Sequence, residues 1–216
     1  LFDAVDPLAE PPQVIPIPGE DAFGSLTFDP TGAQALLYTT AGLVPRYAAW
    51  RVGTDEFRLR STVKPLRAVS VSPDGGTALL FHTQEDAPGA DATSPFRGAW
   101  ALTVLDLADH RTNPLRLPAE PTSFAHGSTG RRGFFIMKGR TFLEAIDYDS
   151  LLHTEVTLRS LPAFVGVLPD LDPADGDEPR AWVSQDHPLG RITLYDPDDG
   201  AVETITGFEL NAQVEE

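Results

Sequence analysis

Short runs of alternating apolar and polar residues, separated by tight turn sequences, recur along this chain of 216 residues. The clearest example is 68–81, where AVSVS leads through the turn Pro73-Asp74-Gly75-Gly76 into TALLF. Alternation with a period of two predicts strands with one buried face, and a Pro-Asp-Gly turn between two such runs predicts a hairpin. A looser copy spans 25–38, with the turn Asp29-Pro-Thr-Gly32. The pattern predicts an all-β protein.

The strand runs come in groups of four. Pro30 and Pro73, in matching turns, lie 43 residues apart, and the third runs, such as those with Trp50 and Trp100, recur at roughly 40 to 50 residues. Four strands per period of about 40–50 residues is the spacing of propeller blades. A β-sandwich also has short strands, but its strands need not repeat in this order. We therefore predict a β-propeller with about four recognisable four-stranded blades, either a small ring or part of a larger one.

The predicted domain covers residues 13–216 and follows an extended, acidic and proline-rich leader at 1–12. Its blades are expected at about 18–62, 63–117, 118–160 and 161–207. Single strands are expected at 13–17 and 208–214, outside these blades. Such unmatched strands indicate a piece of a larger ring, a small four-bladed ring, or a partial ring completed by a flanking chain or by self-association. The chain also begins at Leu1 without a signal peptide, so we expect a processed product or a fragment.

The turns at 29–32 and 72–75 give the chain a resemblance to a known family. They resemble the Ser-Pro-Asp-Gly turn between the first two strands of bacterial WD40-like blades, including the TolB-type and YVTN-type repeats. The segments 147–149 and 196–200 resemble the later turn of those blades, whereas the turn at 126–130 and the acidic insertion after Pro169 depart from the pattern. The resemblance covers about residues 13 to 208. It implies blade architecture and a role in protein binding or assembly, in the periplasm or outside the cell.

The charge of the chain narrows its partners. With 32 acidic and 16 basic residues, the formal net charge is −16. Such a surface repels phosphate backbones and anionic lipids, so we expect neither nucleic acid nor a membrane as a partner. No stretch has the roughly 18–20 apolar residues that a bilayer-spanning helix needs. The absence of cysteine excludes disulfides, thiolate zinc sites and cysteine nucleophiles.

The acidic segment 170–178 is the candidate metal site. Calcium takes six to eight oxygen ligands, and acidic side chains at alternate positions of a tight loop can supply several of them. The candidate ligands are Asp170, Asp172, Asp175, Asp177 and Glu178. Gly176 permits a sharp bend, but the spacing is not that of an EF-hand. The alternative is a solvated acidic hairpin loop.

The other candidate chemistry is sparse. The five histidines are scattered, and only His82 and His187 follow corresponding second strands. The glycines of Gly127-x-x-Gly130-x-x-Gly133 have the spacing of a phosphate loop but lead into a strand, which favours a plain turn. No Gly-x-Ser-x-Gly elbow is present.

These observations favour a non-catalytic binding or assembly module that contacts a protein partner through its long loops, 84–97 and 169–179. The alternative is a propeller-type hydrolase or lactonase with a metal held on the propeller axis. That reaction needs acids and histidines that converge from several blades.

Overall fold

Every regular element that we describe in this protein is a β-strand. The structure is a computed structural model, and it describes residues 23–54, 56–170 and 177–207. This part of the chain contains no helix that is long and apolar enough to cross a membrane. The predicted leader at 1–12 and the single strands predicted at 13–17 and 208–214 lie outside the described residues.

The strands form four antiparallel sheets, each made of four strands in chain order. The first sheet contains β1 (Ser25–Phe28), β2 (Gln34–Tyr38), β3 (Arg46–Arg51) and β4 (Phe57–Ser61). The second contains β5 (Leu66–Val71), β6 (Thr77–His82), β7 (Trp100–Asp106) and β8 (Thr112–Leu117). The third contains β9 (Pro121–His126), β10 (Arg132–Met137), β11 (Phe142–Asp147) and β12 (His153–Thr157). The fourth contains β13 (Pro162–Val167), β14 (Ala181–Gln185), β15 (Arg191–Tyr195) and β16 (Val202–Thr206). The predicted all-β class with four-stranded blades is confirmed.

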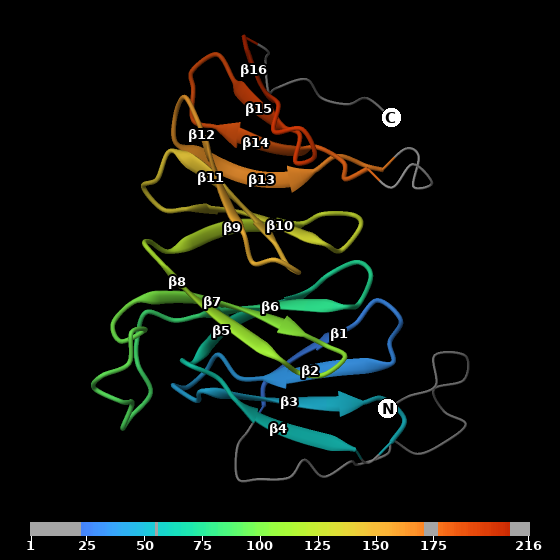
Figure 1. The fold of residues 1–216 in the computed structure, drawn as a ribbon. Helices are drawn as coiled ribbons and strands as arrows, with labels where there is room; N and C mark the ends of the chain where they lie inside the picture. Colours follow the sequence, from blue (N-terminus) through green and yellow to red (C-terminus); the bar gives the residue numbers. More distant parts are fainter. Residues whose placement is uncertain (1–22, 55, 171–176, 208–216) are drawn as a thin grey trace.

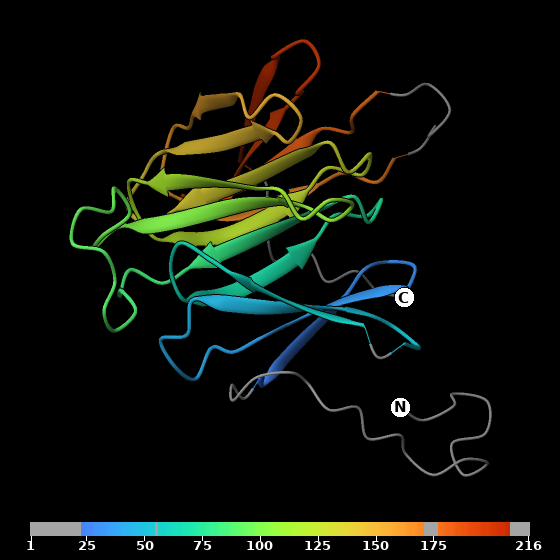
Figure 2. The same ribbon diagram turned by 60° about the horizontal axis from the view of Figure 1, so that its bottom comes forward.

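The four sheets stack face to face in chain order (Figures 1 and 2). One apolar core lies at each of the three junctions. Leu36 and Tyr47 of the first sheet meet Leu80 of the second, and Leu102 of the second meets Phe135 of the third. At the last junction, Phe134 packs at a ring-centroid distance of 6.4 Å from Tyr195. Because both faces of an inner sheet are covered, its central strands are apolar on both sides.

The repeated turn sequence works through side-chain hydrogen bonds to the backbone. In the β1–β2 turn, the Asp29 carboxylate accepts a hydrogen bond from the backbone N of Gln34 at 3.0 Å. In the β5–β6 turn, the hydroxyl of Ser72 accepts one from the backbone N of Thr77 at 3.0 Å. Gly75 has a φ of 75°, in the left-handed region that glycine adopts without strain. Aspartate and serine thus accept the same backbone hydrogen bond at the first position of this turn.

The outward face of the fourth sheet is apolar although no described sheet covers it. The side chains of Phe164 and Ile205 are 52% and 45% exposed, and the Phe164 ring lies 5.5 Å from that of Trp182. Such a face suits a further sheet of the same kind. Completion of the ring by a flanking chain or by self-association stays a prediction.

Gly133 allows a close approach inside the third sheet. A Cβ atom at this position would overlap the phenol oxygen of Tyr148 and lie 3.0 Å from two of its ring carbons. The Tyr148 hydroxyl shares a 2.7 Å hydrogen bond with Nδ1 of His126. The ring of Tyr148 is buried, so it has little room to move.

We expect Gly133→Ala to lower the free energy of unfolding by about 2 kcal/mol, because it displaces Tyr148 in a filled core. Chemical denaturation would measure this change. Gly24→Ala is the control, since a Cβ there meets nothing within 4 Å, and it should change stability by less than about 0.5 kcal/mol. Equal stability of the two variants would show that Tyr148 accommodates the methyl group.

Candidate binding surface

The connections between strands emerge at two opposite ends of the stack. We call the end that carries the long β6–β7 connection the loop face, and the end that carries the β1–β2, β5–β6 and β9–β10 turns the turn face. In Figure 1 the β6–β7 connection projects to the left, away from these turns. Loops on such a rigid scaffold are the usual place for binding residues.

A buried lysine holds the base of the β6–β7 connection. Lys64, in the link between the first two sheets, is only 2% exposed. Its Nζ donates hydrogen bonds to the carbonyl oxygens of Gln84 at 2.8 Å and Phe96 at 3.1 Å, and a third to the carboxylate of Asp86. The three donors of the ammonium group are thus matched by three acceptors. Lys64 therefore joins both ends of the loop to the body of the protein.

Further hydrogen bonds stabilise the same loop from within. The Asp86 carboxylate also accepts from the backbone N of Gly98 at 3.0 Å. Asp91 accepts from the backbone N and the hydroxyl of Thr93, both at 2.8 Å. The hydrogen bond from Lys64 lowers the pKa of Asp86, and the backbone hydrogen bond from Thr93 lowers that of Asp91. Both side chains are consequently anionic at neutral pH.

Hollows flank the loop on the loop face. One of about 260 Å³ lies between the loop and Pro45, Thr62 and Val63. A second, of about 460 Å³, has Leu43, Arg67 and Trp100 among its lining residues. The guanidinium of Arg67 lies 5.5 Å from the centre of the Trp100 ring and pairs with Glu120 at 2.7 Å. A tryptophan and an arginine held beside a hollow are the residue types that contribute most at protein interfaces.

The predicted calcium ligands fall only partly within the described residues. Asp172 and Asp175 lie outside them. Glu178 is buried, and its carboxylate accepts hydrogen bonds from the backbone N of Thr129 at 3.3 Å and from the Thr129 hydroxyl. Asp170 contacts the hydroxyl of Ser128 at 3.5 Å. Among the described residues, no three histidines, aspartates or glutamates are grouped so that they could hold a metal ion. Calcium binding by this loop, including by Asp177, stays a prediction.

The glycine-rich segment 127–133 receives carboxylates of the protein itself. A Cβ at Gly127 would overlap the carboxylate of Glu178, and one at Gly130 would overlap that of Asp74. Glu178 precedes the fourth sheet's second strand, and Asp74 belongs to the second sheet. The turn thus contacts one acidic side chain from each neighbouring blade, which the spacing of the glycines alone does not reveal.

The two histidines expected to correspond do not meet. His82 is fully buried at the end of β6, whereas His187 follows β14 in the fourth sheet. The Nδ1–H of His82 donates to the carbonyl oxygen of Lys64 at 2.9 Å, and its Nε2 accepts from the Thr103 hydroxyl at 2.7 Å. Burial lowers the pKa of His82 to about 4. Both nitrogens of this neutral ring are therefore engaged in the structure.

Sequence reasoning identified the 84–97 loop but missed Lys64. Its three acceptors are 20, 22 and 32 residues away in the chain, and two of them are backbone carbonyls. The available signal was composition, because Lys64 is one of only two lysines and lies between Val63 and Pro65.

Comparisons with known proteins identify the fold. No family model matches the chain, and no curated protein matches it in sequence. Hydrazine synthase of Kuenenia stuttgartiensis is 13% identical with a TM-score of 0.55, over 90% of this chain and 53% of that one. The Cps50 (Swd1) β-propeller domain of Myceliophteria thermophila is 14% identical with a TM-score of 0.55, over 87% and 56%. The WD40 repeats of RRP9 are 6% identical with a TM-score of 0.52, over 90% and 53%. The chain spans about half the length of these structures, and it has the fold of β-propeller blades.

Proposed function

We propose that this chain is a non-catalytic β-propeller module for binding and assembly, part of an exported bacterial protein, which engages a protein partner through its loop face. The observation that carries the proposal is the long exposed loop that Lys64 holds in one conformation beside Trp100 and two hollows. A preorganised loop loses little conformational entropy when it binds, so more of the contact energy appears as affinity. Among the described residues, no three histidines, aspartates or glutamates are grouped so that they could hold a metal ion.

The charge of the loop face indicates the chemistry of the partner. Glu85, Asp86 and Asp91 lie on the loop with a single arginine, Arg97, so segment 84–97 carries a formal charge of −2, and the chain as a whole carries −16. A basic segment with an aromatic or aliphatic residue for the hollow beside Trp100 would complement this face. Attraction between exposed charges weakens with salt, since the Debye length is about 10 Å at 0.1 M ionic strength.

Selection from a displayed library of random peptides tests the proposal. We expect the folded protein to enrich basic peptides that bind more weakly as salt rises. Replacing residues 87–95 with a Gly-Ser segment of equal length, which keeps the Lys64 contacts, should reduce the affinity of those peptides at least about tenfold. Fluorescence anisotropy on individual peptides would measure this loss.

Glu203→Gln provides the control, because Glu203 is an exposed acid on β16, far from the loop in sequence and in another sheet. It should leave peptide affinity unchanged, whereas Glu85→Gln on the loop should weaken it. Peptides that bind the loop replacement as tightly as the original protein would place recognition elsewhere and refute the proposal.

A further inference from the structure

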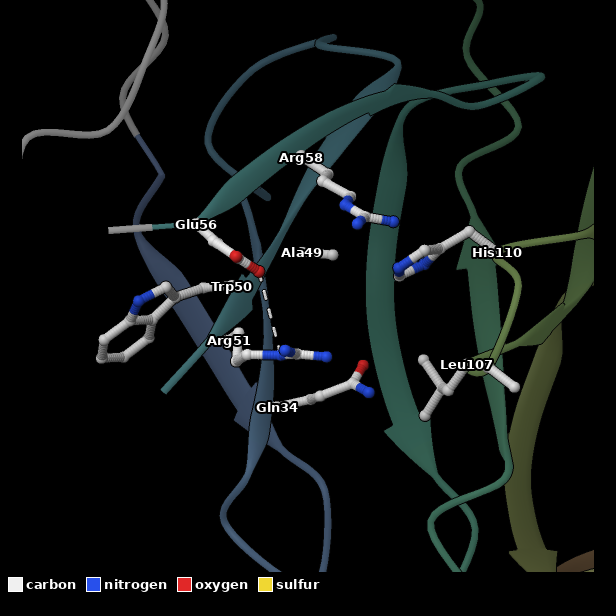
Figure 3. A pocket seen from close by; sticks show the side chains of 9 residues that line it. Gln34, Ala49, Trp50, Arg51, Glu56, Arg58, Leu107 and His110 are labelled. Carbon is white, nitrogen blue, oxygen red and sulfur yellow. Dashed lines mark ion pairs between the residues drawn. The ribbon is translucent and has the colours of Figure 1, made fainter. Parts of the chain in front are cut away.

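A small cavity on the turn face lies between the first two sheets. Its volume is about 70 Å³, which is room for a few waters or one small anion, since one water needs roughly 10–15 Å³ by the same measure. The polar residues that line the cavity are Gln34, Arg51, Arg58, His110 and one acid, Glu56, which pairs with Arg51. Figure 3 shows the side chains of Arg58 and His110 pointing toward one another across it. Three basic side chains therefore meet in a strongly acidic protein.

The register of β4 places two guanidinium groups at this cavity's side of the sheet. Arg58 is paired with Ala49 and Arg60 with Tyr47, and both of these partners face the core shared with the second sheet. Within the described part of the chain, neither arginine has an acidic side chain at ion-pair distance. Arg51, in contrast, lies 3.9 Å from Glu56. Arg58 thus brings a positive charge without an ion-pair partner to the cavity, and Arg60 lies on the same face of β4 outside its lining.

His110 enters from the β7–β8 turn in an uncommon conformation. Its φ is 60°, in the left-handed region that few residues other than glycine adopt. Its Nδ1 is buried and has no hydrogen-bond partner among the described residues. Burial lowers the pKa of His110, and the charges of Arg60 and Arg58 lower it further. The carboxylates of Asp109 and Asp106 raise this pKa, but by less. The field at the ring therefore favours an anion.

We propose that this cavity binds a small tetrahedral oxyanion of the phosphate type, with Arg58 as its principal charged donor and the His110 imidazole as a second. A guanidinium offers two parallel N–H donors that match two oxygens of such an anion. Arg51 and the Gln34 amide, which also face the cavity in Figure 3, supply further donors. One ligand would satisfy the unpaired Arg58 and the unusually placed imidazole together. The site is independent of the loop face.

Proton NMR of the histidine rings tests this site with inorganic phosphate. At constant ionic strength set by sodium chloride, phosphate should shift one histidine signal to saturation and raise its apparent pKa, and that signal should be the one missing in His110→Gln. The groups that act on this titration are Arg58 and Arg60 from β4, Asp106 at the end of β7 and Asp109 in the β7–β8 turn. Arg58→Gln should weaken phosphate binding about tenfold, the effect of losing one hydrogen bond to a charged group.

Arg140→Gln is the control with the same change in charge, because Arg140 is exposed in the β10–β11 turn of the third sheet. It should bind phosphate like the original protein, and thermal unfolding would show that each variant is folded. A loss of binding in Arg140→Gln equal to that in Arg58→Gln would reduce the effect to net charge and overturn the site. Acetate that binds as tightly as phosphate, or phosphate that leaves the His110 signal unmoved, would also overturn it.

Discussion

Lys64→Met should lower the free energy of unfolding by about 3–5 kcal/mol, because it removes a buried charge whose three partners remain in place. Methionine has a similar length and fills the same volume, but it donates no hydrogen bond. The carbonyl groups of Gln84 and Phe96 would then lose their partner. The backbone carbonyl of residue 64 would still accept the hydrogen bond from His82, so the change is confined to the ammonium group.

Chemical denaturation of Lys64→Met and Lys138→Met separates this effect from the general loss of a positive charge. Lys138 is the other lysine; its side chain is 74% exposed and lies 3.5 Å from Glu120. An exposed pair of this kind contributes about 0–1 kcal/mol, so Lys138→Met should be close to the original protein.

The local effect of the same substitution would show in the loop. Amide hydrogens of residues 84–98 should exchange faster with solvent in Lys64→Met than in the original protein, since the loop loses its attachment to the scaffold. Those of the β-strands should change less. If the two lysine variants were equally stable and the loop stayed protected, Lys64 would not be the anchor that the hydrogen bonds indicate. The preorganisation argument for binding would then fail as well.

The architecture was predictable because the determinants of a blade are local. The alternation in 68–81 and the turn at 72–75 lie within one hairpin, and a side chain such as Ser72 acts on a backbone group five residues away. The same four-strand order then repeats without any long-range information. Even the third sheet forms regular strands, although its first turn departs from the repeat.

The candidate sites were hidden because their parts come from different blades. The imidazole of His126 is bonded to Tyr148 in its own sheet and to Ser70 of the second sheet, 56 residues away. The cavity at Arg58 needs the fold of two sheets before His110 approaches it. In the acidic segment, the carboxylate of Glu178 accepts a hydrogen bond from Thr129, 49 residues away, a contact that the spacing of the acids does not indicate. Residue type and spacing predict a hairpin well, but they do not predict which side chains of a neighbouring sheet pack against it.

His82 and His126 should make the protein markedly less stable at pH 5 than at pH 7. Burial lowers the pKa of each imidazole to about 4, compared with 6.5 for a free side chain. Well above pH 6.5 both rings are neutral whether the chain is folded or unfolded, so neither contributes a pH dependence there. Between pH 6.5 and 4 the unfolded chain binds a proton at each ring and the folded chain does not, so stability falls as the pH falls. Each histidine then removes about 2 kcal/mol between pH 7 and pH 5.

Burial keeps both rings neutral, and their hydrogen bonds only partly oppose it. His82 donates to one carbonyl and accepts from Thr103, and a proton on its Nε2 would turn that acceptor into a donor beside the ammonium of Lys64. His126 is bonded at both nitrogens, to Tyr148 at 2.7 Å and to Ser70 at 3.0 Å. Glu144 acts in the opposite direction, because burial raises its pKa and the folded state therefore gains a proton there more readily.

Denaturation curves at pH 5 and pH 7 for the original protein, for His82→Gln/His126→Gln and for His187→Gln isolate the two buried rings. The double variant should be less stable at pH 7, since glutamine does not reproduce the ring's packing, but its loss between the two pH values should be about 4 kcal/mol smaller than that of the original protein. His187→Gln should keep the full pH dependence, because His187 lies outside both contacts. If the double variant lost as much stability on acidification as the original protein, the carboxylates would control the acid response. The two histidines would then stabilise the fold only through packing and hydrogen bonding, and they would not contribute to the pH dependence of stability.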